Sequence, residues 1–239
     1  MLSKIMSPPA IDWQSKFRRR LELVQNEALK RYYAAGIPEP DTPVEDVTFL
    51  AMDFETTGLD PQDNDIITIG TVPFNLNRIW IGQAKQWIVN PRKQLEEESV
   101  VIHGITHSDI LHAPDLSLVY QEVLAQMAGK IMVVHYQKIE REFFDRALQL
   151  RIAEGIEFPL IDTMRVETQI QQKRNGGILK RLRGYKPESV RLGLSRSRYG
   201  LPLYTPHHAL TDAVATAELF QAQIAHHYDR TIPIRQFWE

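Results

Sequence analysis

Apolar positions along the chain first follow a strand-like pattern and later alternate between strands and helices. Three runs rich in β-branched and aromatic residues are joined by short polar turns and predict an antiparallel meander over residues 47–54, 66–74 and 79–89. The later pattern predicts strands over 131–134 and 159–162, and helices near 95–103 and over 116–128, 138–151 and 207–227. Strands followed by strand–helix alternation indicate an α/β fold, with a mixed β-sheet flanked by helices.

A separate amphipathic pattern precedes this core. Between residues 13 and 33, apolar side chains such as Trp13, Phe17 and Leu21 recur at steps of three or four, and most Lys and Arg residues lie off that stripe. We expect one extra N-terminal helix, which either packs on the main domain with its basic face in solvent or contacts nucleic acid or a partner. Prolines at 38, 40 and 43 then mark a linker. The predicted organisation is an N-terminal helix and Pro-rich linker over 1–45, a main domain over 46–230 and a short tail over 231–239.

Composition limits the partners and the location of the protein. The chain has 239 residues, a formal net charge of −2 and no cysteine, which excludes disulfides, thiolate metal sites and cysteine nucleophiles. The near-neutral charge gives no global attraction to a polyanion, so local basic surface or metal ions would have to hold one. The start of the chain lacks the apolar stretch of a signal peptide, and no run approaches the roughly 18 apolar residues of a membrane span. We expect a soluble, cytoplasmic protein with no membrane partner.

The most basic part of the chain lies between residues 173 and 198. Nine Lys or Arg residues stand there with a single acid, Glu188, among Gly176, Gly177, Gly184 and Pro187. The segment is either a flexible, solvated excursion from the fold or a contact for phosphates. We favour phosphate contact because the segment leads directly into a histidine-bearing stretch.

Two acids, Asp53 and Glu55, stand one residue apart at the end of the first predicted strand. Because side chains alternate across a strand, both point to the same face of the sheet. Adjacent buried carboxylates repel each other and destabilise the fold unless a cation compensates them. Carboxylate oxygens at this spacing suit Mg²⁺ or Mn²⁺. The pair therefore predicts a metal site.

A third acid, Asp212, lies on the last predicted helix and follows the pair His207 and His208. If the whole stretch were helical, His208 would share a face with Asp212 and His207 would not. Geometry alone leaves open which histidine acts, or whether both belong to a surface loop or a helix cap.

Four ordered motifs over roughly residues 47–228 resemble those of one enzyme family. They are Asp53-Phe-Glu55-Thr-Thr-Gly-Leu, Val101-Ile-His103-Gly-Ile-Thr106, Val134-His135 followed by an acidic and aromatic helix, and His207 five residues before Asp212-Ala. Together they resemble the DnaQ-like branch of the DEDD 3′–5′ exonucleases, the group of the DNA polymerase III epsilon proofreading subunit. The resemblance implies a ribonuclease H-like fold, an exonuclease domain over 46–230, and two divalent metal ions, Mg²⁺ or Mn²⁺.

The same resemblance assigns roles to single residues. It implies a catalytic histidine five residues before the last aspartate, which selects His207 over His208 and indicates the histidine subclass. It also implies residues that contact the 3′-terminal nucleotide, namely Thr56, Thr57, Glu98 and His103.

The chain departs from the family in the second metal motif. Relatives read His-Asn-x-x-Phe-Asp, whereas this chain reads His135-Tyr-Gln-Lys-Ile-Glu140. Glu140 is the matching fourth metal ligand, beside Asp53, Glu55 and Asp212. Asp145 is the alternative, but the helical pattern places it on the solvated side with Arg141 and Gln149.

Two further polar residues near the motifs have structural interpretations. We expect Asp162 to cap the helix that follows it. We expect His135 to hydrogen-bond within the scaffold rather than to bind metal.

The expected function is the removal of nucleotides from the 3′ end of single-stranded DNA, giving nucleoside 5′-monophosphates, in proofreading or repair. The expected partner is a nucleic acid with a free 3′ end, DNA before RNA. The alternatives are a 3′–5′ exoribonuclease and, because of the change at Glu140, an inactive nucleic-acid-binding module. The stretch after the last helix is short, so we do not expect a tail that holds a polymerase. No feature of the sequence fixes the oligomeric state.

Overall fold

A computed structural model of the chain describes residues 11–93, 105–174 and 188–239. Its sheet has the strand order β3-β2-β1-β4-β5. Strands β1, β2 and β3 form the predicted antiparallel meander, while β4 and β5 continue the sheet in parallel with β1. The strands are β1 (Phe49–Thr56), β2 (Ile66–Phe74), β3 (Lys85–Ile88), β4 (Ile131–Val134) and β5 (Leu160–Asp162).

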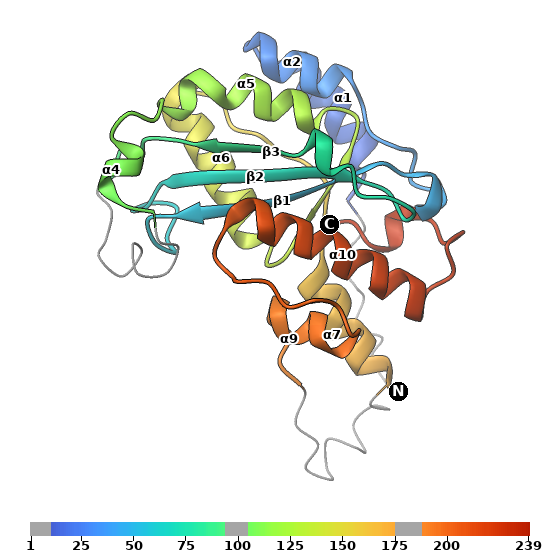
Figure 1. Cartoon of the computed structure of the whole chain (residues 1–239). Helices are drawn as coiled ribbons and strands as arrows, with labels where there is room; N and C mark the ends of the chain where they lie inside the picture. Colours follow the sequence, from blue (N-terminus) through green and yellow to red (C-terminus); the bar gives the residue numbers. More distant parts are fainter. Residues whose placement is uncertain (1–10, 94–104, 175–187) are drawn as a thin grey trace, which may run out of the picture.

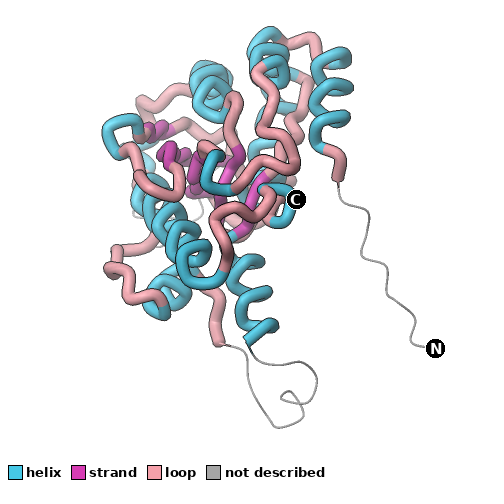
Figure 2. The backbone as a smooth tube through the Cα atoms, turned by 90° about the vertical axis from the view of Figure 1, so that its right-hand side faces the viewer, coloured by secondary structure: helices cyan, strands magenta, loops and turns pink. Residues whose placement is uncertain are grey.

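Helices cover the sheet from both sides (Figures 1 and 2). Helix α10 (Ala209–His227) packs on β1 and β2, and its Phe220 ring lies 5.3 Å from that of Phe49. On the other side of the sheet lies α6 (Lys138–Ile152), whose Phe144 ring has its centroid 6.0 Å from that of the Phe54 ring. Because neighbouring residues of β1 point to opposite faces, Phe49 and Phe54 anchor the strand in both layers.

Shorter helices complete the fold. They are α5 (Leu116–Met127) beside α6, α4 (His107–Ile110), α7 (Thr163–Arg174) directly after β5, and α9 (Leu192–Arg198). Single 3-10 turns occur at Val44–Asp46, Ile81–Gln83 and Ile234–Gln236. Among the described residues, no helix is long and apolar enough to cross a membrane. The cytoplasmic location stays a prediction.

The N-terminal segment forms two helices, so the prediction of one continuous helix was wrong. Helix α1 (Trp13–Leu23) is followed by the extended residue Val24. Helix α2 (Glu27–Ala34) begins after Asn26, whose side chain accepts hydrogen bonds from two backbone N–H groups of α2. The carboxylate of Glu154 accepts hydrogen bonds from the backbone N–H groups of Gln25 and Asn26, with N···O distances of 2.8 Å, and so stabilises the break between the two helices.

The packing of these two helices on the main domain follows the first of the two predicted alternatives. Trp13, Phe17 and Tyr32 belong to the same buried cluster as the sheet. Leu21, which the predicted apolar face includes, is instead 37% exposed. The C-terminal residues Phe237 and Trp238 also join that cluster. The boundaries at 45 and 230 stay predictions.

Two other predicted elements differ in the structure. The run 79–89 forms a strand only over Lys85–Ile88, because a 3-10 turn occupies Ile81–Gln83. The basic segment contains helix α9, so it is not an irregular excursion throughout. The helix expected near 95–103 lies outside the described residues.

Candidate active site

The site lies where three parallel strands end at one edge of the sheet. Strands β1, β4 and β5 run in the same direction, so their carboxyl ends meet. Asp53 and Glu55 stand near the end of β1, His135 directly follows β4, and Asp162 is the last residue of β5. Polar groups from distant parts of the sequence thus gather at one edge.

Helix α10 brings the third acid to this edge. Ligand oxygens of Asp53, Glu55 and Asp212 all lie within 4.8 Å of one another, as the sequence predicted for a metal site. The approach depends on Gly70, the partner of Asp53 in the sheet. A Cβ atom on Gly70 would lie 2.3 Å from the carbonyl carbon of Ala209, so only glycine lets α10 begin here.

A cavity of about 480 Å³ opens over these acids. Besides the three acids, Glu140 and His207 line it, and so do His135 and several residues of α9 and of the loop before α10. Its volume is in the range that commonly holds a small organic ligand. The structure therefore brings the predicted metal ligands and the predicted catalytic histidine into one cavity.

Glu140 and Asp145 occupy different environments on α6. The side chain of Glu140 is 2% exposed and lines the cavity, although it lies outside the group of three acids within 4.8 Å. Asp145 instead accepts hydrogen bonds from the Ile156 N–H and from Gln149, at 2.8 and 2.7 Å. It is half-buried and stabilises the loop after α6, so its predicted solvated position was wrong. Its absence from the cavity lining agrees with the choice of Glu140.

The two histidines before α10 also differ. The Nδ1 atom of His208 lies 3.1 Å from the hydroxyl of Thr211 and accepts from its N–H, so His208 caps the helix. His207 has a left-handed backbone, with φ of 67°, and its N–H donates to an Asp212 oxygen at 2.7 Å. This conformation is uncommon outside glycine and is often found at functional sites. Of the two, only His207 lines the cavity.

Burial and mutual repulsion shift the acids toward their protonated forms. Burial, with the charges of Glu140, Glu55 and Asp212, raises the pKa of Asp53 well above its usual range. Burial and the charge of Asp212 raise the pKa of Glu55 to about 7. The pKa values of Glu140 and Asp212 are raised too, mainly by burial. Each of these groups therefore keeps its proton to a higher pH than a free carboxyl group does, unless a cation takes the place of the proton.

The donor set fits a divalent ion. In the described part of the chain, no lysine or arginine forms an ion pair with any of the four acids. The Glu140 Oε2 atom is buried and has no hydrogen-bond partner there. Four carboxylates that lack a compensating cation supply the hard oxygen ligands that Mg²⁺ and Mn²⁺ prefer.

His135 is held within the scaffold by Thr163. Its Nδ1 lies 2.8 Å from the Thr163 hydroxyl, which itself donates to the Val134 carbonyl. The hydroxyl thus connects the His135 ring to the end of β4. Burial lowers the pKa of His135 to about 4, which keeps the ring neutral. This contact agrees with the predicted structural role.

Asp162 connects the starts of two helices. It accepts from the Met164 N–H at 2.9 Å, which is the predicted cap of α7. It also accepts from the N–H groups of Tyr136 and Gln137, at 3.1 and 3.2 Å, and so fixes Tyr136 in a left-handed conformation just before α6. The second role was missed, because these partners are 25 and 26 residues away in the sequence.

Two arginines of the basic segment are structural. Arg196 is 2% exposed, donates to the Ala215 carbonyl at 2.6 Å and pairs with Glu218 at 2.7 Å, which ties α9 to α10. Arg198 pairs at 3.0 Å with the buried Glu167 of α7. The composition of the segment gave no sign of these pairings, since the partners lie on other helices.

The predicted nucleotide contacts are only partly within the described residues. Glu98 and His103 lie outside them. The Thr56 hydroxyl donates to the Gly58 carbonyl at 2.6 Å, whereas Thr57 is fully buried and its hydroxyl accepts from the Asp65 N–H. Neither threonine is among the residues that line the cavity. Their contact with a nucleotide stays a prediction.

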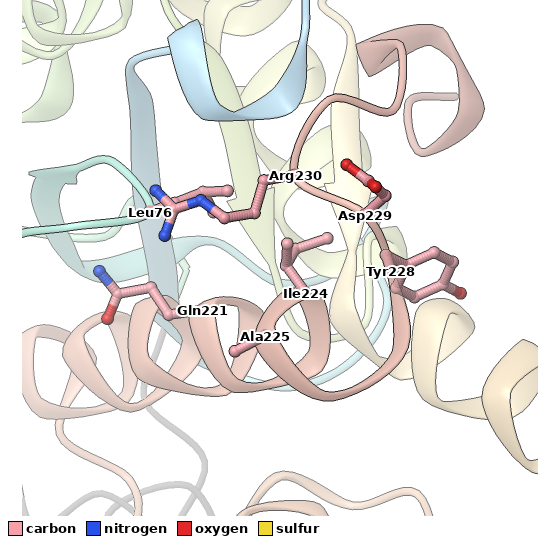
Figure 3. A pocket seen from close by; sticks show the side chains of 7 residues that line it. All are labelled: Leu76, Gln221, Ile224, Ala225, Tyr228, Asp229 and Arg230. Atoms are coloured by element: carbon pink, nitrogen blue, oxygen red, sulfur yellow. The ribbon is translucent and has the colours of Figure 1, made fainter.

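A second cavity, of about 450 Å³, lies at the far end of α10 (Figure 3). Gln221 donates there to the Asn75 carbonyl and Arg230 pairs with Glu45, so both polar side chains are engaged in the fold. None of the predicted site residues lines it. The cavity over the acids is therefore the candidate active site.

Sequence comparison connects this site to known proteins. The profile of the exonuclease (RNase T) family matches residues 50–220. The chain is also similar to a DNA polymerase III subunit epsilon-like protein of Rhodobacter capsulatus, with 31% identity over 181 residues. That match covers 75% of this chain and 24% of the relative, so the chain spans about a quarter of the relative's length.

Two solved structures share the fold. The nuclease domain of 3′hExo, a DEDDh family member bound to rAMP, is 18% identical with a TM-score of 0.60, and the match covers 75% of this chain and 92% of that one. The zinc-bound complex of E. coli ExoI with ssDNA is also 18% identical, with a TM-score of 0.57 and coverage of 76% and 41%. The predicted mixed sheet flanked by helices, of ribonuclease H-like type, is thus confirmed.

Substitution of Gly70 tests whether the approach of α10 assembles the site. Gly70→Ala places a methyl group against the backbone of Ala209, and we expect it to lower the free energy of unfolding by roughly 1 to 3 kcal/mol and to weaken Mn²⁺ binding. Gly82→Ala is the matched control, because a Cβ there meets nothing within 4 Å. Chemical denaturation and calorimetric titration measure both effects. Unchanged Mn²⁺ affinity in Gly70→Ala would contradict the argument.

The raised pKa of Glu55 predicts how stability depends on pH. The folded chain keeps the Glu55 proton up to about pH 7, while the unfolded chain loses it near pH 4.3, so stability falls as pH rises through this window. In EDTA, we expect wild type to lose roughly 2 to 3 kcal/mol relative to Glu55→Gln between about pH 5 and pH 8.

The comparison with Glu55→Gln reports on Glu55 together with its charge coupling to Asp53 and Glu140. His135, whose lowered pKa acts in the opposite direction below about pH 6.5, is common to both chains and cancels. Addition of Mn²⁺ at pH 8 should stabilise wild type more than the variant, because the ion binds the charged carboxylate. Urea denaturation measures the difference, and a gap that does not change with pH would show that Glu55 titrates normally.

Proposed function

Because the chain belongs to the exonuclease (RNase T) family, we propose that it is a metal-dependent 3′–5′ exonuclease that releases nucleoside 5′-monophosphates. The observation that carries this proposal is the group of carboxylates in one cavity, with oxygens of Asp53, Glu55 and Asp212 within 4.8 Å and Glu140 beside them. Four clustered carboxylates repel an anionic phosphodiester, so they can take part in its hydrolysis only with bound cations that attract it.

We propose single-stranded DNA with a free 3′ end as the substrate. Support comes from the similarity to a DNA polymerase III subunit epsilon-like protein and from the fold shared with ExoI, whose structure holds ssDNA. RNA is the second candidate, because the 3′hExo nuclease domain of the same fold binds rAMP. A cellular role in proofreading or repair belongs to the same proposal.

Each residue of the site has a proposed role. Asp53, Glu55, Glu140 and Asp212 would hold two divalent ions, Mg²⁺ or Mn²⁺, which when bound supply water activation and stabilise the leaving 3′-oxygen. His207 would act as the general base and accept the proton of the attacking water at a ring nitrogen. The hydrogen bond from the His207 N–H to Asp212 holds the histidine beside the acids.

Release of product from the 3′ end tests the proposal directly. We expect nucleoside 5′-monophosphates from a 3′-labelled oligonucleotide, none from a 3′-blocked one, and none in EDTA. Wild-type protein that binds the oligonucleotide but releases nothing with Mg²⁺ or Mn²⁺ would favour the inactive binding module. Matched DNA and RNA oligonucleotides separate the two substrates.

Glu140→Ala and Asp145→Ala together test the fourth metal ligand. We expect Glu140→Ala to lower kcat by at least about 100-fold, because it removes a ligand. Asp145→Ala should keep its activity and lose roughly 1 to 2 kcal/mol of stability, because it breaks the hydrogen bond to Ile156. The assignment fails if Asp145→Ala abolishes activity and Glu140→Ala does not.

The adjacent histidines form a second matched pair. We expect His207→Ala to lower kcat about 100-fold, as loss of a general base does. His208→Ala should keep kcat within a few-fold and lose the cap of α10, roughly 1 kcal/mol of stability. Activity of the wild type should fall in acid, since protons compete with the cations for the carboxylates. Equal losses of kcat in His207→Ala and His208→Ala would count against His207 as the base.

A further inference from the structure

We infer that Arg191 binds a backbone phosphate of the substrate strand next to the scissile one. This inference rests on the proposed function and adds a contact that holds the strand rather than cuts it. Arg191 precedes helix α9 and lines the same cavity as Asp53 and Glu55.

The three described arginines around α9 have different environments. Arg196 is buried and engaged by Ala215, Pro202 and Glu218. Arg198 is engaged by Glu167. Arg191 is exposed, and in the part of the chain that the structure describes its guanidinium has neither an ion pair nor a hydrogen bond. Of the three, Arg191 alone is available to a ligand, and it faces the candidate site.

The surroundings of Arg191 suit a single nucleic-acid strand. Leu192, Leu203 and Tyr204 line the same cavity, and Leu203 is 80% exposed. The Tyr204 ring is fixed by Arg196, whose guanidinium carbon lies 4.6 Å from the ring centroid, and by a hydrogen bond to Glu218. An exposed cation beside apolar and aromatic side chains is the combination that binds the backbone and bases of a single strand.

Charge explains why a separate cation is needed. The scissile phosphate would lie over the acids, whose bound cations would hold it. Two divalent ions only balance the charge of four carboxylates, so the site offers no net attraction to the next phosphate along the strand. An exposed arginine that lines the same cavity supplies that attraction and can bind a phosphate through two parallel hydrogen bonds.

A pair of substrates separates this contact from the cleavage step. A DNA oligonucleotide carries phosphates beyond the scissile one, whereas thymidine 5′-p-nitrophenyl phosphate carries the scissile phosphate alone. We expect Arg191→Gln to lower kcat/KM on the oligonucleotide about 10-fold, mostly through KM, and to leave the small ester unchanged. The slope of log KM against log salt on the oligonucleotide should fall by about 0.7, as for one lost phosphate contact.

Two other variants control for charge and geometry. Arg191→Lys keeps the charge without the bidentate geometry, so its loss should be smaller than that of Arg191→Gln. Arg78→Gln removes the same charge from an exposed turn after β2, at the opposite end of that strand from the acids. It should leave kcat/KM unchanged on both substrates. Thermal denaturation verifies that each variant is folded.

Every outcome decides the inference. Equal losses on both substrates would place Arg191 at the scissile phosphate or in the scaffold and overturn it. An unchanged KM for the oligonucleotide would overturn it as well. If wild type hydrolyses neither substrate, the proposed function itself fails, which is distinguishable because the loss then precedes any substitution.

Discussion

Repulsion among buried carboxylates is the constraint on which the rest of the structure depends. Two ionised groups 4.8 Å apart repel each other by roughly 3 kcal/mol at an effective dielectric constant of about 20. A surface ion pair contributes about 1 kcal/mol or less and could not offset this. Protonation or bound cations must relieve it, and the raised pKa values of Asp53 and Glu55 express the same repulsion together with burial.

The fold supplies the force that holds these acids together. Strand β1 cannot move, because Phe49 and Phe54 are packed into opposite helix layers. Helix α10 is held against β2 at Gly70 and tied to α9 through the Arg196 contact with Ala215. Displacement of the acids would therefore disturb the core itself. The packing of the scaffold therefore offsets the repulsion among the carboxylates until cations bind.

The sequence predicted those features of the site that depend on local spacing or on a recognisable motif. Alternation along β1 placed Asp53 and Glu55 on one face, and the resemblance to the exonuclease family selected the histidine that lines the cavity. What the sequence could not predict depends on partners far along the chain. The break between α1 and α2 requires the Glu154 carboxylate, and Asp145 is engaged by the loop after its own helix. Arg196 carried no local sign of burial, since its partners lie on α10 and in the loop before it.

Glu140 shows how an unusual ligand can be accommodated in this scaffold. Its backbone position follows from Asp162, which fixes the turn at Tyr136 and thereby the first residues of α6. The side chain has one more methylene than aspartate and is 2% exposed, and one of its oxygens has no hydrogen-bond partner among the described residues. Its oxygens lie outside the group of three acids within 4.8 Å, yet of the neighbouring acids its charge has the largest effect on the pKa of Asp53. A fourth acid that is fixed at its base therefore adds to the repulsion that a shared cation would relieve.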